Sequence, residues 1–244
     1  MGHDVTVRQD ADARTEERKA AVVGGGRPKP QGIAEWAVAE LRARIADGEF
    51  APGARLVEDE VCELLGVSRN TLREAFRLLA HERLLVQHHN RGVFVRELTA
   101  EDVADLYRVR RLVELSAVQG LQGRPDGLER MAEAMAEAEV AEARQDWRAL
   151  GTANLHFHQG LAALTGSARV DELMARIIAE LRLAFQAMDD PFAFHRRYLE
   201  RNRLILRLLE AGEGGAAATA IAEYLDEAED ELLKAHRRKP AEGG

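Results

Sequence analysis

The stretch GVSRNTLREAFRLLAHERLL, residues 66–85, decides the fold of the N-terminal part of this chain. Ser68 suits the N-cap of a helix, because its side-chain oxygen can accept a backbone N–H at the helix start. The apolar residues of that helix share one side of a helical wheel: Leu72, Ala75, Phe76 and Leu79. The polar and basic residues share the other side: Arg69, Asn70, Arg73 and Arg77. The pattern predicts an amphipathic helix with a basic outer face.

Two helices are predicted before this stretch. Apolar residues recur at helical spacing from Ile33 to Ile45, and Gly48 is placed to end that helix. The segment VEDEVCELLG, residues 57–66, predicts a short second helix that ends at its glycine. Its apolar residues are expected to point inward: Val57, Val61, Leu64 and Leu65. A short, glycine-containing connection joins it to the next helix, so the pair forms a helix-turn-helix.

A β-hairpin is predicted after these helices. The segment LLVQHHNRGVFVRE, residues 84–97, alternates around an Asn-Arg-Gly turn. Leu85 and Val86 fall on one strand and residues 93–95 on the other. Three helices and a hairpin over residues 31–97 predict a winged helix-turn-helix domain.

The rest of the chain is predicted to be helical. Thr99 and Asp102 resemble a capping box that begins this part. Gly-, Pro- and Asp-containing breaks divide it into predicted helices at 100–122, 126–143, 146–164, 168–188, 192–210 and 215–236. We therefore expect an all-α bundle of about six helices over residues 98–238. The ends, residues 1–30 and 239–244, are predicted to be tails, the first of them disordered.

Charge is distributed unevenly along the chain. The formal net charge is -8, and residues 98–244 hold 19 basic against 26 acidic residues. Residues 66–96, by contrast, hold six arginines against two glutamates. Exposed arginines are often only a solvated helix face. Their combination with a helix-turn-helix and a hairpin with a basic tip favours a surface that binds nucleic acid phosphate.

Composition excludes two other classes of protein. The single cysteine, Cys62, rules out an internal disulfide. No window approaches the roughly 18 uninterrupted apolar residues of a membrane span, and the N-terminal residues lack the apolar run of a signal peptide. We therefore expect a cytoplasmic protein without a membrane partner.

The run FAPGARLVEDEVCELLGVSRNTLREAFRLLAHERLLVQHHNRGVFV, residues 50–95, resembles the N-terminal domain of the GntR family of bacterial transcription regulators. The motifs PG..L, LGVSR, LREA, L..E.L and RG.FV occur in the family's order and spacing. Three later segments resemble the FadR-type C-terminal domain called FCD: LYRVRRLVE, NLHFHQGLAALTG and RNRLILRLLEAGEGGAAATAIAEYL. The resemblance covers almost the whole chain after the first tail.

The resemblance implies a homodimer, most often a repressor, that binds an inverted-repeat operator in double-stranded DNA. The recognition helix enters the major groove of each half-site, and the wing reaches toward the minor groove. Residues at the matching positions of the recognition helix are Ser68, Arg69, Asn70 and Arg73, with Thr71 expected to hold a phosphate. The wing tip is formed by His89, Arg91 and Gly92. Arg69 and Arg73 are the candidates for guanine, because a guanidinium can pair with O6 and N7 together.

The resemblance also bears on metal binding, since many FadR-type domains hold a divalent metal with one Asp and three His. The matching positions here are Asn154, His158, Asn202 and Tyr224. One imidazole, two neutral amides and a phenol lack the donors and the charge that a transition metal needs. We expect no metal and no other cofactor. An alternative site rebuilt with His195 stays open, whereas His156 lies on another side of its helix.

Those four polar residues can instead hydrogen-bond an organic effector directly. The alternative is that they are only buried polar groups that satisfy one another. Arg110 matches an arginine that often faces the cavity in related domains, and it suits the carboxylate of a small organic acid. Glu114 lies one turn later and could equally neutralise Arg110 as an i,i+4 partner.

The sequence thus predicts a ligand-responsive, sequence-specific DNA-binding transcription regulator. One alternative is a constitutive DNA-binding regulator with a vestigial effector pocket. The other is an enzyme tethered to DNA, which is not expected because no activated nucleophile and no spaced acid–base pair is present.

Overall fold

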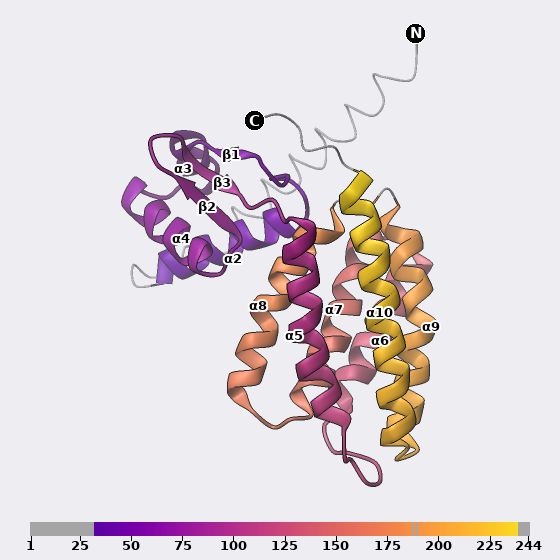
Figure 1. Cartoon of the computed structure of the whole chain (residues 1–244). Helices are drawn as coiled ribbons and strands as arrows, with labels where there is room; N and C mark the ends of the chain where they lie inside the picture. Colours follow the sequence, from indigo (N-terminus) through magenta and orange to yellow (C-terminus); the bar gives the residue numbers. More distant parts are fainter. Residues whose placement is uncertain (1–31, 187, 189, 239–244) are drawn as a thin grey trace.

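The computed structural model describes residues 32–186, 188 and 190–238. Both predicted tails, residues 1–30 and 239–244, lie outside the described residues. The chain is mainly helical, with a small three-stranded sheet in its N-terminal part. Figure 1 shows this N-terminal domain placed at one end and side of a bundle of long helices. The predicted fold class is therefore confirmed.

The N-terminal domain consists of α2 (Ile33–Ala46), β1 (Arg55–Leu56), α3 (Glu58–Leu65), α4 (Arg69–His81), β2 (Leu85–His88) and β3 (Gly92–Val95). Its sheet is antiparallel in the order β1-β3-β2, and Val86 pairs with Phe94 across the hairpin. The inner face of the sheet and one side of α2 and α4 form a common hydrophobic core. Strand β1 was not predicted, because two residues are too few to show an alternating pattern.

The short helix α3 differs from expectation. Val61 and Leu65 are buried, but Val57 and Leu64 are 37% and 38% exposed. The helix begins at Glu58, so Val57 is its extended N-cap residue and does not share the helical face. Leu64 lies about 100° around the axis from Leu65, so the narrow buried face of this helix excludes it. The prediction that all four apolar residues point inward was wrong for these two.

The C-terminal domain consists of α5 (Ala100–Val118), α6 (Glu129–Ala143), α7 (Trp147–Ala163), α8 (Ala168–Phe185), α9 (Pro191–Glu210) and α10 (Gly214–Arg238). Helix α7 contacts α5, α6, α8 and α9 and is the central element of the bundle. The capping box of Thr99 and Asp102 is present at the start of α5. Helix α5 ends earlier and α6 begins later than predicted, because glycines 120, 123 and 127 all have positive φ.

Helix α8 connects the two domains. Gln186, at its C-cap, donates a hydrogen bond from Nε2 to the carbonyl of Ile45 at 2.7 Å, which ties it to the end of α2. Arg96, which follows β3, forms an ion pair with Glu180 of α8 at 2.7 Å and another with Asp102 of α5. Burial raises the pKa of the Glu180 carboxyl. The N-terminal domain is thus attached to α8 by a buried carboxylate and a side-chain amide.

Candidate DNA-binding surface and buried polar cluster

The basic face of α4 points away from the core. The N-cap Ser68 accepts the backbone N–H of Thr71 at 3.2 Å, as predicted, and its hydroxyl lies 2.9 Å from that of Thr71. The side chains of Arg69, Arg73 and Arg77 are 65%, 57% and 70% exposed. The helix therefore presents its positive dipole end and three guanidinium groups to solvent, an arrangement that suits a phosphate backbone.

Each of these arginines already has a carboxylate partner. Arg69 pairs with Asp59 and Arg73 with Glu58, both from the first turn of α3. Arg77 pairs with Glu74 one turn earlier on α4 itself. These are exposed pairs, so each is screened by water and salt and can give way to a stronger anionic partner.

The wing turn places His89, Arg91 and Gly92 at its tip. His89 and Arg91 are exposed, and Gly92 has a φ of 106°, which a residue with a Cβ rarely adopts. The Nε of Arg55 lies 3.3 Å from the position that a Cβ on Gly92 would occupy. The absence of a side chain at Gly92 thus allows Arg55 of β1 to lie close to the wing tip. This basic residue was not predicted from the sequence.

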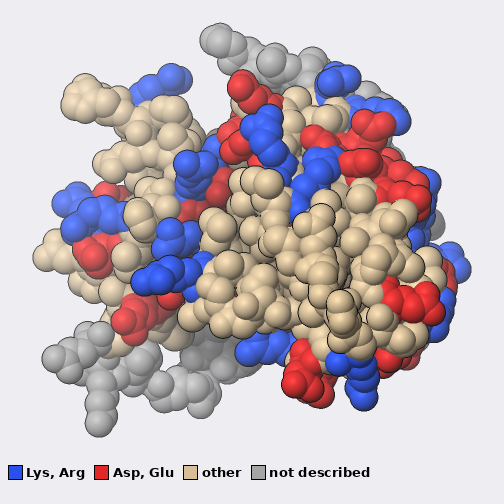
Figure 2. Space-filling view, turned by 60° about the horizontal axis from the view of Figure 1, so that its bottom comes forward, with Lys and Arg blue, Asp and Glu red and all other residues tan. Residues whose placement is uncertain are grey.

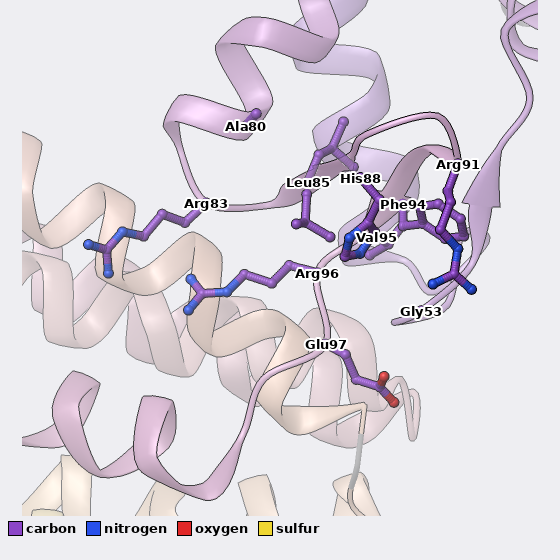
Figure 3. Close-up of a pocket in the computed structure, with 11 residues that line it drawn as sticks. Gly53, Ala80, Arg83, Leu85, His88, Arg91, Phe94, Val95, Arg96 and Glu97 are labelled. Carbon is purple, nitrogen blue, oxygen red and sulfur yellow. The ribbon is translucent and has the colours of Figure 1, made fainter. Parts of the chain in front are cut away.

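A surface cleft of about 700 Å3 runs along the wing and the linker that follows it. Its lining includes Arg83, His88, Arg91 and Arg96, with Glu97 as its acidic residue. In Figure 3, Arg83 and Arg96 extend together toward the C-terminal helices, away from Arg91. Figure 2 shows basic side chains gathered over the N-terminal domain, on the left of that face, beside a broad uncharged area of the C-terminal domain. Positive charge near the DNA-binding domain therefore extends beyond α4.

The five residues predicted to hold an effector lie in one buried cluster of the C-terminal domain. They are all 6% exposed or less: Arg110 of α5, Asn154 and His158 of α7, Asn202 of α9 and Tyr224 of α10. Asn154 Oδ1 accepts hydrogen bonds from Asn202 Nδ2 at 2.7 Å and from the Tyr224 hydroxyl at 3.0 Å. The rings of Tyr224 and His158 pack edge to face with centroids 4.6 Å apart.

Glu114 joins the remaining members of this cluster. Arg110 Nε donates to Glu114 Oε1 at 2.7 Å, and His158 Nδ1 lies 2.7 Å from Glu114 Oε2. A carboxylate only accepts, so His158 carries its proton on Nδ1 and exposes a lone pair on Nε2. The i,i+4 pairing of Arg110 with Glu114 that the sequence suggested is present.

Burial and charge set the protonation of this triad. Burial opposes the charged form of Glu114, but Arg110 and His158 outweigh it and lower the pKa of that carboxyl. Burial lowers the pKa of His158 and outweighs the nearby carboxylate, so the ring is neutral. The triad therefore consists of one cation, one anion and a neutral imidazole.

Several polar atoms of the cluster have no hydrogen-bond partner among the described residues. They are Arg110 Nη2, His158 Nε2, Asn202 Oδ1 and the hydroxyl of the neighbouring Tyr198. Buried polar atoms are costly when unpaired, so they are normally satisfied by water or a ligand. The cluster therefore has donors and acceptors left for a bound molecule. Tyr198 was not predicted, because no motif marks it.

The cluster does not fit a transition metal. Asn154, Asn202 and Tyr224 offer neutral oxygen or nitrogen atoms, and His158 is the one imidazole among them. Within the described ranges, no group of three or more His, Cys, Asp or Glu side chains could hold a metal ion. His195 packs between Phe185 and Phe194, where burial lowers its pKa to about 3. His156 is exposed and contacts Glu137, so neither histidine rebuilds the site.

Two known protein families match separate parts of this chain. Residues 33–95 match the bacterial regulatory proteins of the gntR family, and residues 105–227 match the FCD domain. No helix of the described part of the chain is long and apolar enough to cross a membrane.

Similar proteins cover most of the chain. A probable D-xylose utilization operon transcriptional repressor of Paenarthrobacter nicotinovorans is 30% identical over 74% of this chain and 80% of that protein. An HTH-type transcriptional regulator of Streptomyces ambofaciens is 29% identical over 82% of this chain and 85% of its own length. A shorter match to the regulator YdhC of Bacillus subtilis is 39% identical and covers 36% of that protein.

A solved structure supports the same assignment. The crystal structure of a putative GntR transcriptional regulator from Rhodococcus sp. RHA1 has a TM-score of 0.79 and 46% identity. It covers 82% of this chain and 97% of that protein. This chain belongs to the GntR family of bacterial transcription regulators and carries an FCD domain at its C-terminal end.

Proposed function

We propose that this regulator binds an inverted-repeat operator as a homodimer and acts as a repressor. A small effector changes its affinity for the operator. The observation that carries the proposal is the exposed arginine face of α4, which begins at the Ser68 cap beside a basic wing. The similarity to a probable D-xylose utilization operon transcriptional repressor supports the repressor role.

The proposed DNA contacts follow from exposure and position. Arg69 and Arg73 read guanine, and each good bidentate pair provides roughly 1–3 kcal/mol of base discrimination. Ser68 and Asn70 contact neighbouring base edges, and Thr71 holds a phosphate. The wing tip, His89, Arg91 and Gly92, contacts the minor-groove side.

The C-terminal domain supplies the proposed dimer contact. Leu112 on α5 is 69% exposed and Leu173 on α8 is 43% exposed. Helices α5 and α8 contact each other, so the two leucines belong to adjoining elements. Exposed large apolar side chains can belong to subunit contacts, and these two leucines are the candidates on α5 and α8.

The proposed effector site is the buried cluster of Arg110, Asn154, His158, Asn202 and Tyr224. Arg110 Nη2 can donate to one oxygen of an organic acid or a related metabolite, while its Nε stays with Glu114. His158 Nε2 and Asn202 Oδ1 would accept from hydroxyl groups of the same molecule. No catalytic step is proposed, since the matched families consist of regulators, and the cytoplasmic location stays a prediction.

The DNA-binding part is tested with Arg73→Ala and, as a matched control, Arg77→Ala on the next turn of the same face. A duplex selected from a random pool by the full-length protein serves as the operator. A dimer reads two half-sites, so Arg73→Ala should weaken operator binding by about 30-fold or more. The control should lose much less, and size-exclusion chromatography with light scattering should show an intact dimer. Unchanged operator affinity of Arg73→Ala would refute the assignment.

A constitutive regulator with a vestigial pocket is the second candidate. The Arg110–Glu114 pair and the Asn154–Asn202–Tyr224 bonds favour it, because the cluster already satisfies many of its own groups. Gluconate, galactonate and xylose, which the names of several relatives mention, are suitable first probes. A ligand that binds only the folded state raises the melting temperature, and a shift that is absent in His158→Leu would support the sensor.

A further inference from the structure

The first turn of α3 places a carboxylate against the recognition helix. Glu58 Oε1 and Oε2 both lie 3.1 Å from Arg73 Nε, and Oε2 lies 2.9 Å from Arg73 Nη2. The glutamate side chain is 33% exposed and the arginine side chain 57% exposed. The two helices of the helix-turn-helix are thus joined at the residue proposed to read a base.

The geometry of this contact leaves a defined part of the guanidinium free. Nε and Nη2 form the side edge of the group, and Glu58 occupies that edge. The end edge, formed by Nη1 and the second hydrogen of Nη2, remains unoccupied by any hydrogen bond of the described residues. Two donors in a fixed plane are what bidentate pairing with guanine O6 and N7 requires.

We propose that Glu58 is a positioning residue for base readout: it holds the side edge of Arg73 so that the end edge faces the guanine. This assignment rests on the proposed function of Arg73 as a base contact. Arginine has a long, flexible side chain, so fixing its plane before binding reduces the ordering cost that the DNA contact must otherwise overcome.

The negative charge of Glu58 should also weaken DNA binding in a measurable way. A carboxylate near the DNA repels phosphate, so Glu58 lowers binding to every sequence. The same carboxylate strengthens discrimination by orienting Arg73. Glu58 should therefore decrease non-specific affinity and increase the ratio of specific to non-specific affinity.

A simpler explanation is that acidic residues stabilise the N-terminus of α3 through the helix dipole. Glu58, Asp59 and Glu60 all lie in this first turn, so each would interact similarly with the positive end of the helix dipole. Glu60 is exposed, and no ion pair or hydrogen bond joins its side chain to another described residue. Glu60→Gln is therefore a matched control, because it removes the same charge from the same turn without touching Arg73.

The test uses full-length wild type, Glu58→Gln, Glu58→Ala and Glu60→Gln. Fluorescence anisotropy measures affinity for the duplex selected by the wild type and for a scrambled duplex of equal length, over a range of salt concentrations. All three variants should bind the scrambled duplex more tightly than the wild type. Glu60→Gln should keep the specificity ratio, whereas Glu58→Ala should lower it by about fivefold or more, with Glu58→Gln between them.

A second readout separates positioning from stability. Single-base-pair variants of the duplex locate the lost specificity. Glu58→Ala should lose discrimination at the same base pair as Arg73→Ala. Specificity ratios of Glu58→Ala and Glu60→Gln that agree within twofold would overturn the positioning role while leaving the proposed function intact. A wild-type protein that selects no sequence would overturn the proposed function itself, and this assignment with it.

Discussion

Removing the charge of Glu114 should strongly destabilise the C-terminal domain. This carboxylate is 0% exposed and is the partner of Arg110 Nε and His158 Nδ1. Glu114→Gln would leave the Arg110 guanidinium, 2% exposed, as an uncompensated buried charge. Breaking one side of such a pair typically costs about 3–5 kcal/mol.

The reverse substitution, Arg110→Met, should cost less at low pH than at high pH. Without Arg110, the Glu114 carboxylate favours a protonated His158, so the folded-state pKa of that ring rises. Burial and, to a lesser extent, Arg110 lower that pKa in the wild type, so the stability of the neutral ring is fully present above the unfolded value of about 6.5 and is lost as pH falls. Without Arg110, less of that stability is lost at low pH. The loss in free energy of unfolding should therefore be smaller at pH 5.5 than at pH 8.

Urea denaturation at fixed protein concentration measures these losses, since the stability of the proposed dimer would depend on concentration. The double variant Arg110→Met/Glu114→Gln leaves neither charge alone and should cost at least about 2 kcal/mol less than the sum of the single losses. Additive losses, or a cost below about 1 kcal/mol for Glu114→Gln, would show that the pair is not electrostatically coupled in the folded protein.

Two further perturbations test the packing around His195. A Cβ at Gly151 would lie 2.7 Å from His195 Nε2, so Gly151→Ala should lower the free energy of unfolding by about 1–2 kcal/mol in urea titrations, after allowing for the better helix propensity of alanine. The control, Gly215→Ala, meets nothing within 4 Å and should be neutral or stabilising, so equal effects would contradict the packing argument. Because the pKa of His195 is lowered to about 3, its neutral state contributes stability that is fully present above pH 6.5 and lost as pH falls toward 3. Wild type should lose about 2.7 kcal/mol more than His195→Leu between pH 8 and 4.5. Identical pH profiles of the two proteins in thermal or urea unfolding would disprove this prediction.

The sequence predicted those parts of the fold that repeat over many residues. The apolar face of α4 and the alternation of the hairpin were sufficient to place both, as the buried Leu72 and Val95 illustrate. Strand β1 and the exposure of Leu64 were missed, because both depend on a few residues and on how neighbouring elements pack. Helix ends near residues 118–129 depended on which glycines adopt positive φ, which spacing alone does not determine.

Prediction of the site divides in a similar way. The resemblance to the FCD domain identified five residues, and the structure places them in one cluster: Arg110, Asn154, His158, Asn202 and Tyr224. The link from Glu114 to His158 joins residues 44 apart in the chain, and that from Glu58 to Arg73 joins residues 15 apart. Such contacts depend on the rotamers and packing angle of two helices, so no local pattern reveals them.

Arginine–carboxylate pairs occur at three depths in this protein, and burial gives each a different function. Arg73–Glu58 is exposed, so salt screens it and its energetic contribution is small; its value lies in orientation, and DNA can displace or complement it. Arg96–Glu180 is partly buried and joins the DNA-binding domain to α8. Arg110–Glu114 is fully buried, so it is insensitive to salt but sensitive to any ligand that brings charge into the cluster. A charged effector would therefore act on the innermost pair, while ionic strength acts on the outermost one. Arg96 joins the DNA-binding domain to both α8 and α5 through Glu180 and Asp102.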